Sequence, residues 1–302
     1  MMKNIVLIAI LLLSAPALSA ELMQFKHLVS IYKYPESNDP KAAEIKINQP
    51  EGVACRGKSI LVSDTANARL QPYTLQDDGS IKPGPGAGIQ VAYPMHVRMN
   101  SKGDIFVLDG KQHKILRMGA TGEAKGNFEL EGVPAPEAWI PKNFAIDAND
   151  NMYILDVFSS RVLVASPEGK FQRQIVFPAT DGFFSDLTVD PQGTIFILNS
   201  ITSMVYSAVP DDKAFSPLKS GLKDFVTFPT SLTADKQYLY IVDQFGSGIV
   251  ILGKDGTVRG RKLKMGWKEG EVHYPSDICL NEEGEMFIAD RGNNRVQIYT
   301  RE

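Results

Sequence analysis

Apolar residues in this chain come in short runs separated by turns rich in Gly, Asn and Asp. Residues 105–108 (IFVL) and 286–289 (MFIA) are typical, and each run follows a segment suited to a tight turn, residues 100–104 (NSKGD) or 281–285 (NEEGE). A further apolar run follows each of them, as in residues 113–118 (HKILRM). Short apolar runs bounded by such turns predict an all-β protein built from antiparallel strands.

This strand pattern repeats along the chain. The copies begin at Pro50, Pro94, Pro141, Phe184, Pro229 and Pro275. Their second strands end at Asp64, Asp109, Asp156, Asn199, Asp243 and Asp290, which are 45, 47, 43, 44 and 47 residues apart. Periods of about 45 residues, each with four antiparallel strands, predict a six-bladed β-propeller.

The last copy stops at its third strand, residues 295–300 (RVQIYT). A missing fourth strand would leave an unpaired sheet edge, which promotes aggregation. Residues 23–33 (MQFKHLVSIYK) precede the first copy and have the character of a fourth strand. We therefore expect this N-terminal strand to complete the last blade and close the ring.

The repeat resembles the NHL repeat: a proline, an apolar strand, a Gly turn, a second strand ending in Asp, and a basic residue five positions later. The similarity is clearest in residues 50–69 and 275–299, and residues 266–275 (GWKEGEVHYP) resemble the usual lead-in of this family. The resemblance covers residues 24–302 and implies a six-bladed propeller of the extracytoplasmic bacterial type. The fourth copy departs from the pattern, with Asn199 for Asp and Met204 for Arg, but keeps its spacing. The fold alone does not indicate a function, because propellers host enzymes, RNA readers and protein-binding platforms.

Residues 1–20 have the composition of a secretory signal peptide. Lys3 precedes the apolar run 5–13, and the small residues 14–20 (SAPALSA) follow it. We predict cleavage after Ala20, with Ala17 or Ser19 as the alternatives. The apolar run is shorter than the roughly 20 residues that cross a bilayer. The chain is therefore predicted to be secreted and periplasmic, with residues 21–302 forming the propeller.

The chain carries a formal net charge of −3. This balance provides no positive field that would attract nucleic acid or an anionic membrane. Beyond the first 20 residues, no apolar run approaches the length of a membrane span. We expect no nucleic-acid partner, no membrane span, and a monomer when the protein is free.

An acidic and a basic residue recur around one loop of most blades. The pairs are Asp64 and Arg69, Asp109 and Lys114, Asp156 and Arg161, and Asp290 and Arg295. The carboxylate is expected to accept hydrogen bonds from backbone N–H groups of the turn. Exposed ion pairs of this kind contribute about 0–1 kcal/mol, so we interpret the recurring pair as structural rather than catalytic.

The residues just after the start of each copy are expected to surround the mouth of the central channel. The first position holds Glu51, Met95, Lys142, Ser185, Thr230 and Ser276, and the second holds Gly52, His96, Asn143, Asp186, Ser231 and Asp277. In the second set, His96, Asn143, Asp186 and Asp277 are candidate ligands for a divalent cation in the channel. Their oxygen atoms suit calcium, and the imidazole favours a transition metal. Alternatively, Asn143 and Asp277 only cap the starts of their strands.

Two groups of enzymes with similar propellers provide a contrast. Peptidyl-hydroxyglycine lyases place zinc-binding histidines directly after the blade prolines, and this chain has none at those positions. Gluconolactonase-like propellers hold a divalent ion with Glu, Asn and Asp at a comparable level, and only Glu51 matches at the first position. No catalytic residue and no cofactor are therefore assigned from the sequence.

Cys55 and Cys279 differ by one strand position when the first and last copies are aligned. Their side chains should therefore point to opposite faces of their own blades, as two groups facing each other across adjoining blades would. Because the first and last blades are neighbours in a closed ring, the cysteines either form a disulfide across this seam or both face away from it.

Large aromatic residues lie in the connections on the predicted binding side. The candidates for a binding face are Trp139, Phe158, Phe245 and Trp267. Aromatic side chains on a rigid face are typical anchors of protein interfaces; the alternative is that they cover the joints between blades. The leading hypothesis is a non-catalytic module that binds a protein partner or acts as a scaffold at the cell envelope. The alternative function is a metal-dependent hydrolase or lyase, similar to a lactonase, with its site at the channel mouth.

Overall fold

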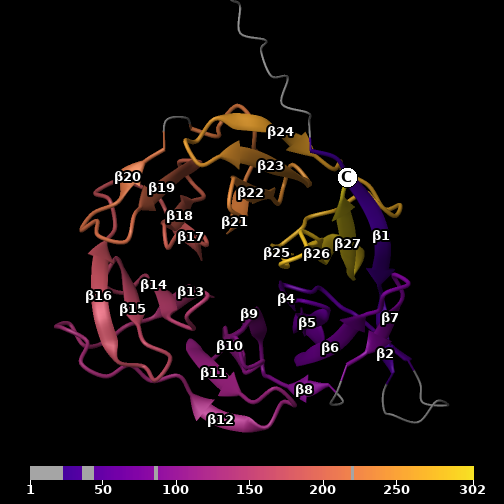
Figure 1. Cartoon of the computed structure of the whole chain (residues 1–302), viewed down its shortest axis with the longest axis horizontal. Coiled ribbons are helices and arrows are strands. Elements are labelled where there is room, and N and C mark those ends of the chain that lie inside the picture. The colour runs from indigo at the N-terminus through magenta and orange to yellow at the C-terminus, as the bar shows by residue number, and fades with distance from the viewer. Residues whose placement is uncertain (1–22, 36–43, 85–87, 219–220) are drawn as a thin grey trace, which may run out of the picture.

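The computed structural model describes residues 23–35, 44–84, 88–218 and 221–302. Six antiparallel sheets are arranged around a central axis, so the chain is the all-β six-bladed propeller that its repeats predict (Figure 1). The predicted signal peptide lies outside the described residues. Within the described parts of the chain, no helix is long and apolar enough to cross a membrane.

Each blade has four strands, which follow one another from the axis outward. Blade 1 contains β4 (Gly52–Arg56), β5 (Ser59–Asp64), β6 (Arg69–Leu75) and β7 (Ile81–Pro83), with β8 (Ile89–Gln90) also on β6. Blade 2 contains β9 (Pro94–Met99), β10 (Ile105–Asp109), β11 (Lys114–Met118) and β12 (Ala124–Asn127), and blade 3 contains β13 (Pro141–Ile146), β14 (Met152–Asp156), β15 (Arg161–Ala165) and β16 (Phe171–Val176). Blade 4 contains β17 (Phe184–Val189), β18 (Ile195–Asn199), β19 (Met204–Ala208) and β20 (Ser216–Pro217), and blade 5 contains β21 (Pro229–Ala234), β22 (Tyr238–Asp243), β23 (Gly248–Gly253) and β24 (Val258–Lys262). Blade 6 contains β25 (Asp277–Leu280), β26 (Met286–Asp290), β27 (Arg295–Arg301) and β1 (Phe25–Ile31). Short 3-10 turns η1 (Thr65–Asn67) and η2 (Arg291–Asn293) follow β5 and β26, and β2 (Lys33–Pro35) pairs with β3 (Glu44–Lys46).

The N-terminal strand closes the ring, as predicted. β1 pairs antiparallel with β27, from Phe25 opposite Arg301 to Ile31 opposite Val296, with a bulge after His27. In Figure 1 β1 lies on the outer edge of blade 6, next to the strand that ends the chain. The edge that the last repeat leaves unpaired is therefore covered by residues from the other end of the chain.

Buried apolar side chains fill the space between neighbouring blades. The middle strands have both faces covered by adjacent blades, so that every residue of β10, β14 and β18 is buried. This burial explains why these strands are runs of consecutive apolar residues instead of alternating ones. One apolar cluster lies at each of the six joints between blades, and these clusters supply the main driving force for folding.

A disulfide joins the first and last blades across the seam of the ring. Cys55 in β4 and Cys279 in β25 are bonded, with their Cα atoms 5.9 Å apart. The sequence left this pairing open, because strand position does not fix whether both side chains face the seam. The ring is therefore closed twice, by β1 on the outside and by the disulfide near the axis.

In most blades the aspartate that ends the second strand holds two loops together. In blade 3, Asp156 accepts hydrogen bonds from the backbone N–H groups of Ile140 at 3.0 Å and Phe158 at 3.1 Å, and from Arg161 Nε at 3.0 Å. Ile140 belongs to the connection from the previous blade, and Phe158 to the loop after β14. The predicted structural role of the aspartate is thus seen in detail.

The ion pairs of these loops are buried, so the expectation of exposed pairs was wrong. The side chains of Asp64 and Arg69, Asp156 and Arg161, and Asp290 and Arg295 are at most 8% exposed, because the connections between blades cover them. In blade 2 the exposed Lys114 is not bonded to Asp109, which instead accepts from Gln112 Nε2 at 3.2 Å. Removing one partner of a buried pair costs about 3–5 kcal/mol, because the other charge is left buried and uncompensated, so we expect these loops to be sensitive to substitution of either residue.

Candidate functional site

The predicted ring of side chains lines a cavity at one end of the channel. The cavity has a volume of about 210 Å³, and all six residues of the first position, Glu51, Met95, Lys142, Ser185, Thr230 and Ser276, contribute to its wall. We call this cavity the axial cup. It opens on the face that carries the loops after the second strands, since Asp109 pairs with Pro94 and Asp156 with Pro141 at that end of the sheets. We call that side of the disc the Asp-loop face.

Residues of the second position form hydrogen bonds from blade to blade beneath this wall. His96 Nε2 lies 3.0 Å from the carbonyl oxygen of Phe144 and donates from blade 2 to blade 3. Asn143 Nδ2 donates to Asp186 Oδ1 at 2.5 Å, from blade 3 to blade 4. Asp186 Oδ2 in turn accepts from the backbone N–H of Leu232 in blade 5 at 2.8 Å.

Asp277 continues the ring of contacts to its closure. Ser231 Oγ in blade 5 donates to Asp277 Oδ1 at 3.0 Å, and the backbone N–H of Val53 in blade 1 donates to Asp277 Oδ2 at 3.0 Å. Arg98 Nη1 in blade 2 donates to the carbonyl oxygen of Val53 at 3.2 Å. Hydrogen bonds therefore connect all six blades around the axis. We call this set the channel belt; its side chains are His96, Arg98, Asn143, Asp186, Ser231 and Asp277.

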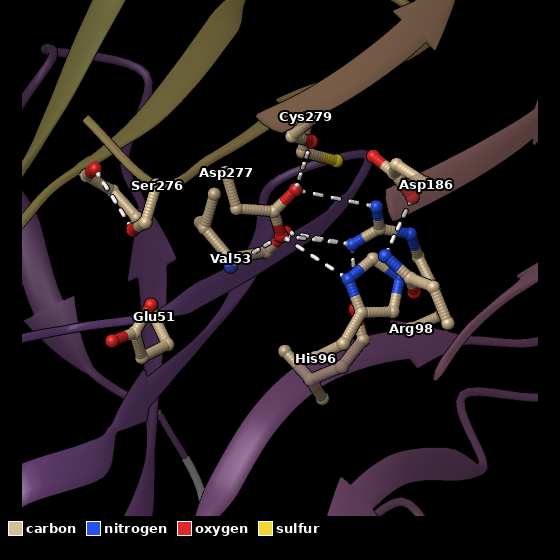
Figure 2. A network of polar contacts seen from close by, with 12 residues as sticks. Glu51, Val53, His96, Arg98, Asp186, Ser276, Asp277 and Cys279 are labelled. Atoms are coloured by element: carbon tan, nitrogen blue, oxygen red, sulfur yellow. Dashed lines mark hydrogen bonds and ion pairs between the residues drawn. The ribbon is translucent and has the colours of Figure 1, made fainter. Parts of the chain in front are cut away.

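Arg98 is a residue of the belt that sequence reasoning missed. Its Nη1 atom lies 3.1 Å from Asp277 Oδ2, and Figure 2 shows the guanidinium between the inner strands, facing that carboxylate. A signal was present in the repeats, because the corresponding position elsewhere holds only small residues. These residues are Ala54, Ala145, Thr188, Thr233 and Cys279.

Burial and Arg98 set the protonation of the belt. Burial, with the nearby Asp277 charge, raises the pKa of Asp186 to about 7. Burial also acts on Asp277, but the adjacent Arg98 charge holds the pKa of this carboxyl below its usual value. Burial and Arg98 lower the pKa of His96 to about 3, so this imidazole is neutral at pH 7. One ionised carboxylate, that of Asp277, therefore lies next to the partly buried guanidinium of Arg98.

The four candidate metal ligands lie at one level of the channel, but they form two separate pairs. Asn143 bonds to Asp186, whereas His96 Nδ1 lies 3.7 Å from Asp277 Oδ2. Among the residues that the structure describes, no group of three or more His, Cys, Asp or Glu is placed to hold a metal ion. Both carboxylates already accept protein donors at each oxygen, including the backbone N–H groups of Leu187 and Ile278 that follow them. The capping role, the alternative for Asn143 and Asp277, is present: Asn143 Oδ1 accepts from the N–H of Phe144 at 2.7 Å.

The four candidate anchors differ in exposure. Trp139 is partly buried against the apolar cluster between blades 2 and 3, which is the alternative role considered for these residues. Phe158 is 56% exposed, Phe245 53% and Trp267 72%. Three of the four candidates are therefore available on the Asp-loop face.

More apolar residues lie exposed on this face than the sequence suggested. Tyr93, Ile140, Phe183, Ile201, Phe225 and Tyr274 are also exposed, in the loops after second strands or in the connections between blades. Their exposure could not be read from the sequence, because an apolar residue in a loop is as often covered by a neighbouring loop.

Some of these rings form a continuous series across blades 5 and 6. Phe228 stacks on Phe245 with centroids 4.9 Å apart, and Phe245 meets the edge of Tyr274 at 6.0 Å. Tyr274 and His273 are 4.4 Å apart, and His273 and Trp267 5.5 Å apart. We call these five residues the aromatic row. It begins at the axial cup, since Phe228 also lines the cup.

Comparisons with known proteins support the fold. Residues 273–299 match the model of the NHL repeat, in the copy where the resemblance is clearest. No curated protein matches the chain by sequence. The family pattern is therefore strongest in the last blade.

Solved structures with a similar fold include enzymes. A streptogramin B lyase is 12% identical with a TM-score of 0.62, covering 92% of this chain and 100% of that one. A gluconolactonase from Xanthomonas campestris is 13% identical with a TM-score of 0.62, covering 93% and 100%. A protein of unknown function from Bacteroides thetaiotaomicron is 17% identical with a TM-score of 0.67, covering 93% and 76%. At these identities the likeness establishes the propeller fold and no activity.

Proposed function

We propose that the protein is a non-catalytic binding or scaffold module that acts outside the cytoplasm, at the cell envelope, and docks a protein partner on its Asp-loop face. One observation carries this proposal: large apolar side chains are exposed together on that face. Exposed apolar groups of this kind mark interaction sites on otherwise polar surfaces.

The aromatic row supplies the type of side chain that anchors protein interfaces. Phe245, Tyr274 and Trp267 are all exposed, and they belong to one series of ring contacts. Aromatic residues are enriched among those that contribute most to binding, because they bury much area while losing few rotamers. A row that crosses two blades favours an extended segment or a broad surface as the partner.

The loops of this face are held in place before any partner arrives. Asp243 accepts from the backbone N–H of Phe228 at 2.9 Å, and Asp290 accepts from that of His273 at 2.7 Å. Both bonds fix the backbone of the aromatic row itself. Preorganised anchors lose little conformational entropy on binding, which favours affinity.

Hollows beside the anchors offer room for partner side chains. One of about 340 Å³ lies between blades 3 and 4 beside Phe183, and one of about 320 Å³ lies between blades 2 and 3 beside Trp139 and Ile140. The disulfide between Cys55 and Cys279 supports a location outside the cytoplasm, because disulfides persist in oxidising compartments.

Site-specific photo-crosslinking in the source cells tests the docking face. A photoreactive phenylalanine analogue at position 245 should give a defined protein adduct. The same analogue at Val209, which is 49% exposed and lies after β19 at the opposite end of blade 4, should give none. Adducts only from position 209, or none from position 245, would contradict the proposal.

A metal-dependent hydrolase or lyase with its site in the axial cup is the second candidate. The observation in its favour is that His96 and Asp277 line the cup, while the buried Asp186 has its pKa raised to about 7, where a carboxyl can act as acid or base. A metal would have to displace hydrogen bonds of the channel belt, which weighs against it.

Metal analysis of the purified protein separates the two candidates. The binding-module proposal expects less than stoichiometric Ca²⁺ or Zn²⁺ and no turnover of lactones. A stoichiometric ion that is lost in Asp186→Ala, together with turnover, would establish the enzyme instead.

A further inference from the structure

The axial cup lies at the end of the aromatic row and opens on the Asp-loop face. Of the belt residues, His96, Asn143, Ser231 and Asp277 are on its lining, and Arg98 and Asp186 are off it. A group bound on the Asp-loop face can therefore reach into the cup. Its volume of about 210 Å³ is smaller than those of the two hollows beside the anchors, about 340 and 320 Å³, which favours the end of a chain over a loop that enters and leaves.

The cup has one cationic group without a carboxylate partner. Glu51 Oε1 lies 2.6 Å from Arg291 Nε, and Asp277 is paired with Arg98. Lys142 forms no ion pair with any described residue, and its Nζ lies over the ring of Phe183, 5.2 Å from the centroid. Since the other two charges are matched, the wall offers an anionic group one free ammonium.

Polar and apolar groups lie side by side on the wall. Met95, Phe183 and Phe228 supply apolar surface next to Lys142, and the hydroxyl of Thr230 has no hydrogen-bond partner among the described residues. A chain-terminal residue combines a carboxylate with an adjacent side chain in the same way. An internal Asp or Glu side chain carries only its carboxylate and would leave the apolar surface uncovered.

We propose that the axial cup binds the free C-terminus of the partner, with the carboxylate on Lys142 and an apolar last side chain against Met95, Phe183 and Phe228. This inference rests on the proposed docking at the Asp-loop face. The residues before the C-terminus would then lie along the aromatic row, which starts at Phe228. Capture of a terminal carboxylate by a few fixed donors is an established way to recognise a peptide end.

Fluorescence anisotropy with three peptide mixtures tests the inference. Each is an N-terminally labelled Gly-Ser hexapeptide whose last two residues are drawn from Leu, Ile, Val and Phe. One has a free C-terminal carboxylate, one is amidated, and one is amidated with an internal Glu. The free acid should bind about tenfold more tightly than the amide, as one charge-assisted hydrogen bond would give.

Substitutions at two lysines assign the effect. Lys142→Met should bring the free acid to the affinity of the amide, and Lys142→Gln should do the same. Lys111→Met, on the exposed loop after β10, should change nothing. Circular dichroism checks that each variant is folded.

Several outcomes would overturn the inference: no binding of the free acid, equal binding of acid and amide, or equal binding of the internal-Glu peptide. An unchanged preference in Lys142→Met would do so as well. If photo-crosslinks from position 245 persist while the peptides fail, only this inference falls and the docking face stands. If the crosslinks fail while the peptides bind, the cup is a carboxylate site but docking on the surrounding face is wrong.

Discussion

Two rings of side chains one residue apart in each inner strand have different roles. The first ring, from Glu51 to Ser276, lines the axial cup, and its contacts between blades lie at the seam, from Glu51 to Arg291 and from Ser276 Oγ to the carbonyl oxygen of Pro50. Polar members of the second ring, such as Asp186 and Asp277, are used in the hydrogen bonds that run from blade to blade around the axis. The strand pleat turns neighbouring residues differently, so that only some second-ring residues, namely His96, Asn143, Ser231 and Asp277, share the lining of the cup. Polar residues near a propeller channel therefore do not by themselves indicate a binding or catalytic site, because those of the second ring hold the blades together.

The largest difference in stability is expected between substitutions of two adjacent residues, Asp277 at the start of β25 and Ser276 just before it. Asp277→Ala removes the acceptor for Ser231 and leaves Arg98 without its counter-charge, which should lower the free energy of unfolding by about 3–5 kcal/mol. Ser276→Ala, in the first ring, should cost no more than about 1 kcal/mol. Urea denaturation of both variants measures the two free energies of unfolding. Equal losses would mean that the two rings do not differ in this way.

The disulfide allows a covalent contact to be compared with the belt at the same seam. Cys279 lies two residues after Asp277, and both residues connect blade 6 to blade 1. Cys55→Ala together with Cys279→Ala should lower the free energy of unfolding by about 2–5 kcal/mol, because the unfolded chain loses a long covalent loop. Denaturation of the unmodified protein with and without reductant provides the control. A loss below about 1 kcal/mol would show that β1 and the belt close the seam without it.

The raised pKa of Asp186 gives the belt a pH dependence. Its folded value of about 7 exceeds its usual value, so the folded protein binds this proton more strongly than the unfolded chain. The stabilisation of the folded state by this proton is therefore complete at pH values below about 4. It is lost as the pH rises to about 7, at up to about 1.4 kcal/mol per pH unit. Asp186→Asn should flatten this part of the stability curve, although it costs a hydrogen bond. Thermal melts from pH 4 to 8 measure the slope, and an unchanged slope would contradict the assignment.

The smallest effect on stability is expected at Lys142. Lys142→Met removes a charge that has no ion-pair partner among the described residues, so the free energy of unfolding should change by less than about 0.5 kcal/mol. Arg98→Met, in the belt, should cost several times more because it leaves Asp277 buried without a cation. Denaturation of the two variants in parallel decides this point. A large loss in Lys142→Met would place the first ring in the structural framework as well.

Most of the fold could be predicted from the spacing of the repeats. The positions of Asp64 to Asp290 gave the blades, and the missing strand after residues 295–300 gave the closure by β1. All six residues of the first ring lie where the repeat placed them. These features were predictable because they depend on the order of strands, which a periodic sequence states directly.

Features that depend on contacts between blades were not predictable to the same degree. The pairing of Cys55 with Cys279 needed the direction of both side chains at the seam, which strand order leaves open. The role of Arg98 needed its reach across blade 1 to Asp277, and the burial of Arg69 needed the connection that covers it. Exposure of Trp267 and partial burial of Trp139 were likewise decided by neighbouring loops.

The pairing of β1 with β27 has a mechanical consequence. Phe25 lies opposite Arg301, and the backbone N–H of Glu302 donates to the carbonyl oxygen of Gln24 at 3.0 Å, so both strands leave the sheet at the same point. Tension between these residues would separate the two strands one bond pair at a time, as in unzipping, instead of shearing all pairs together. The disulfide near the axis lies outside that path. A propeller pulled at Gln24 and Glu302 would therefore release β1 at low force, while the disulfide kept the first and last blades joined.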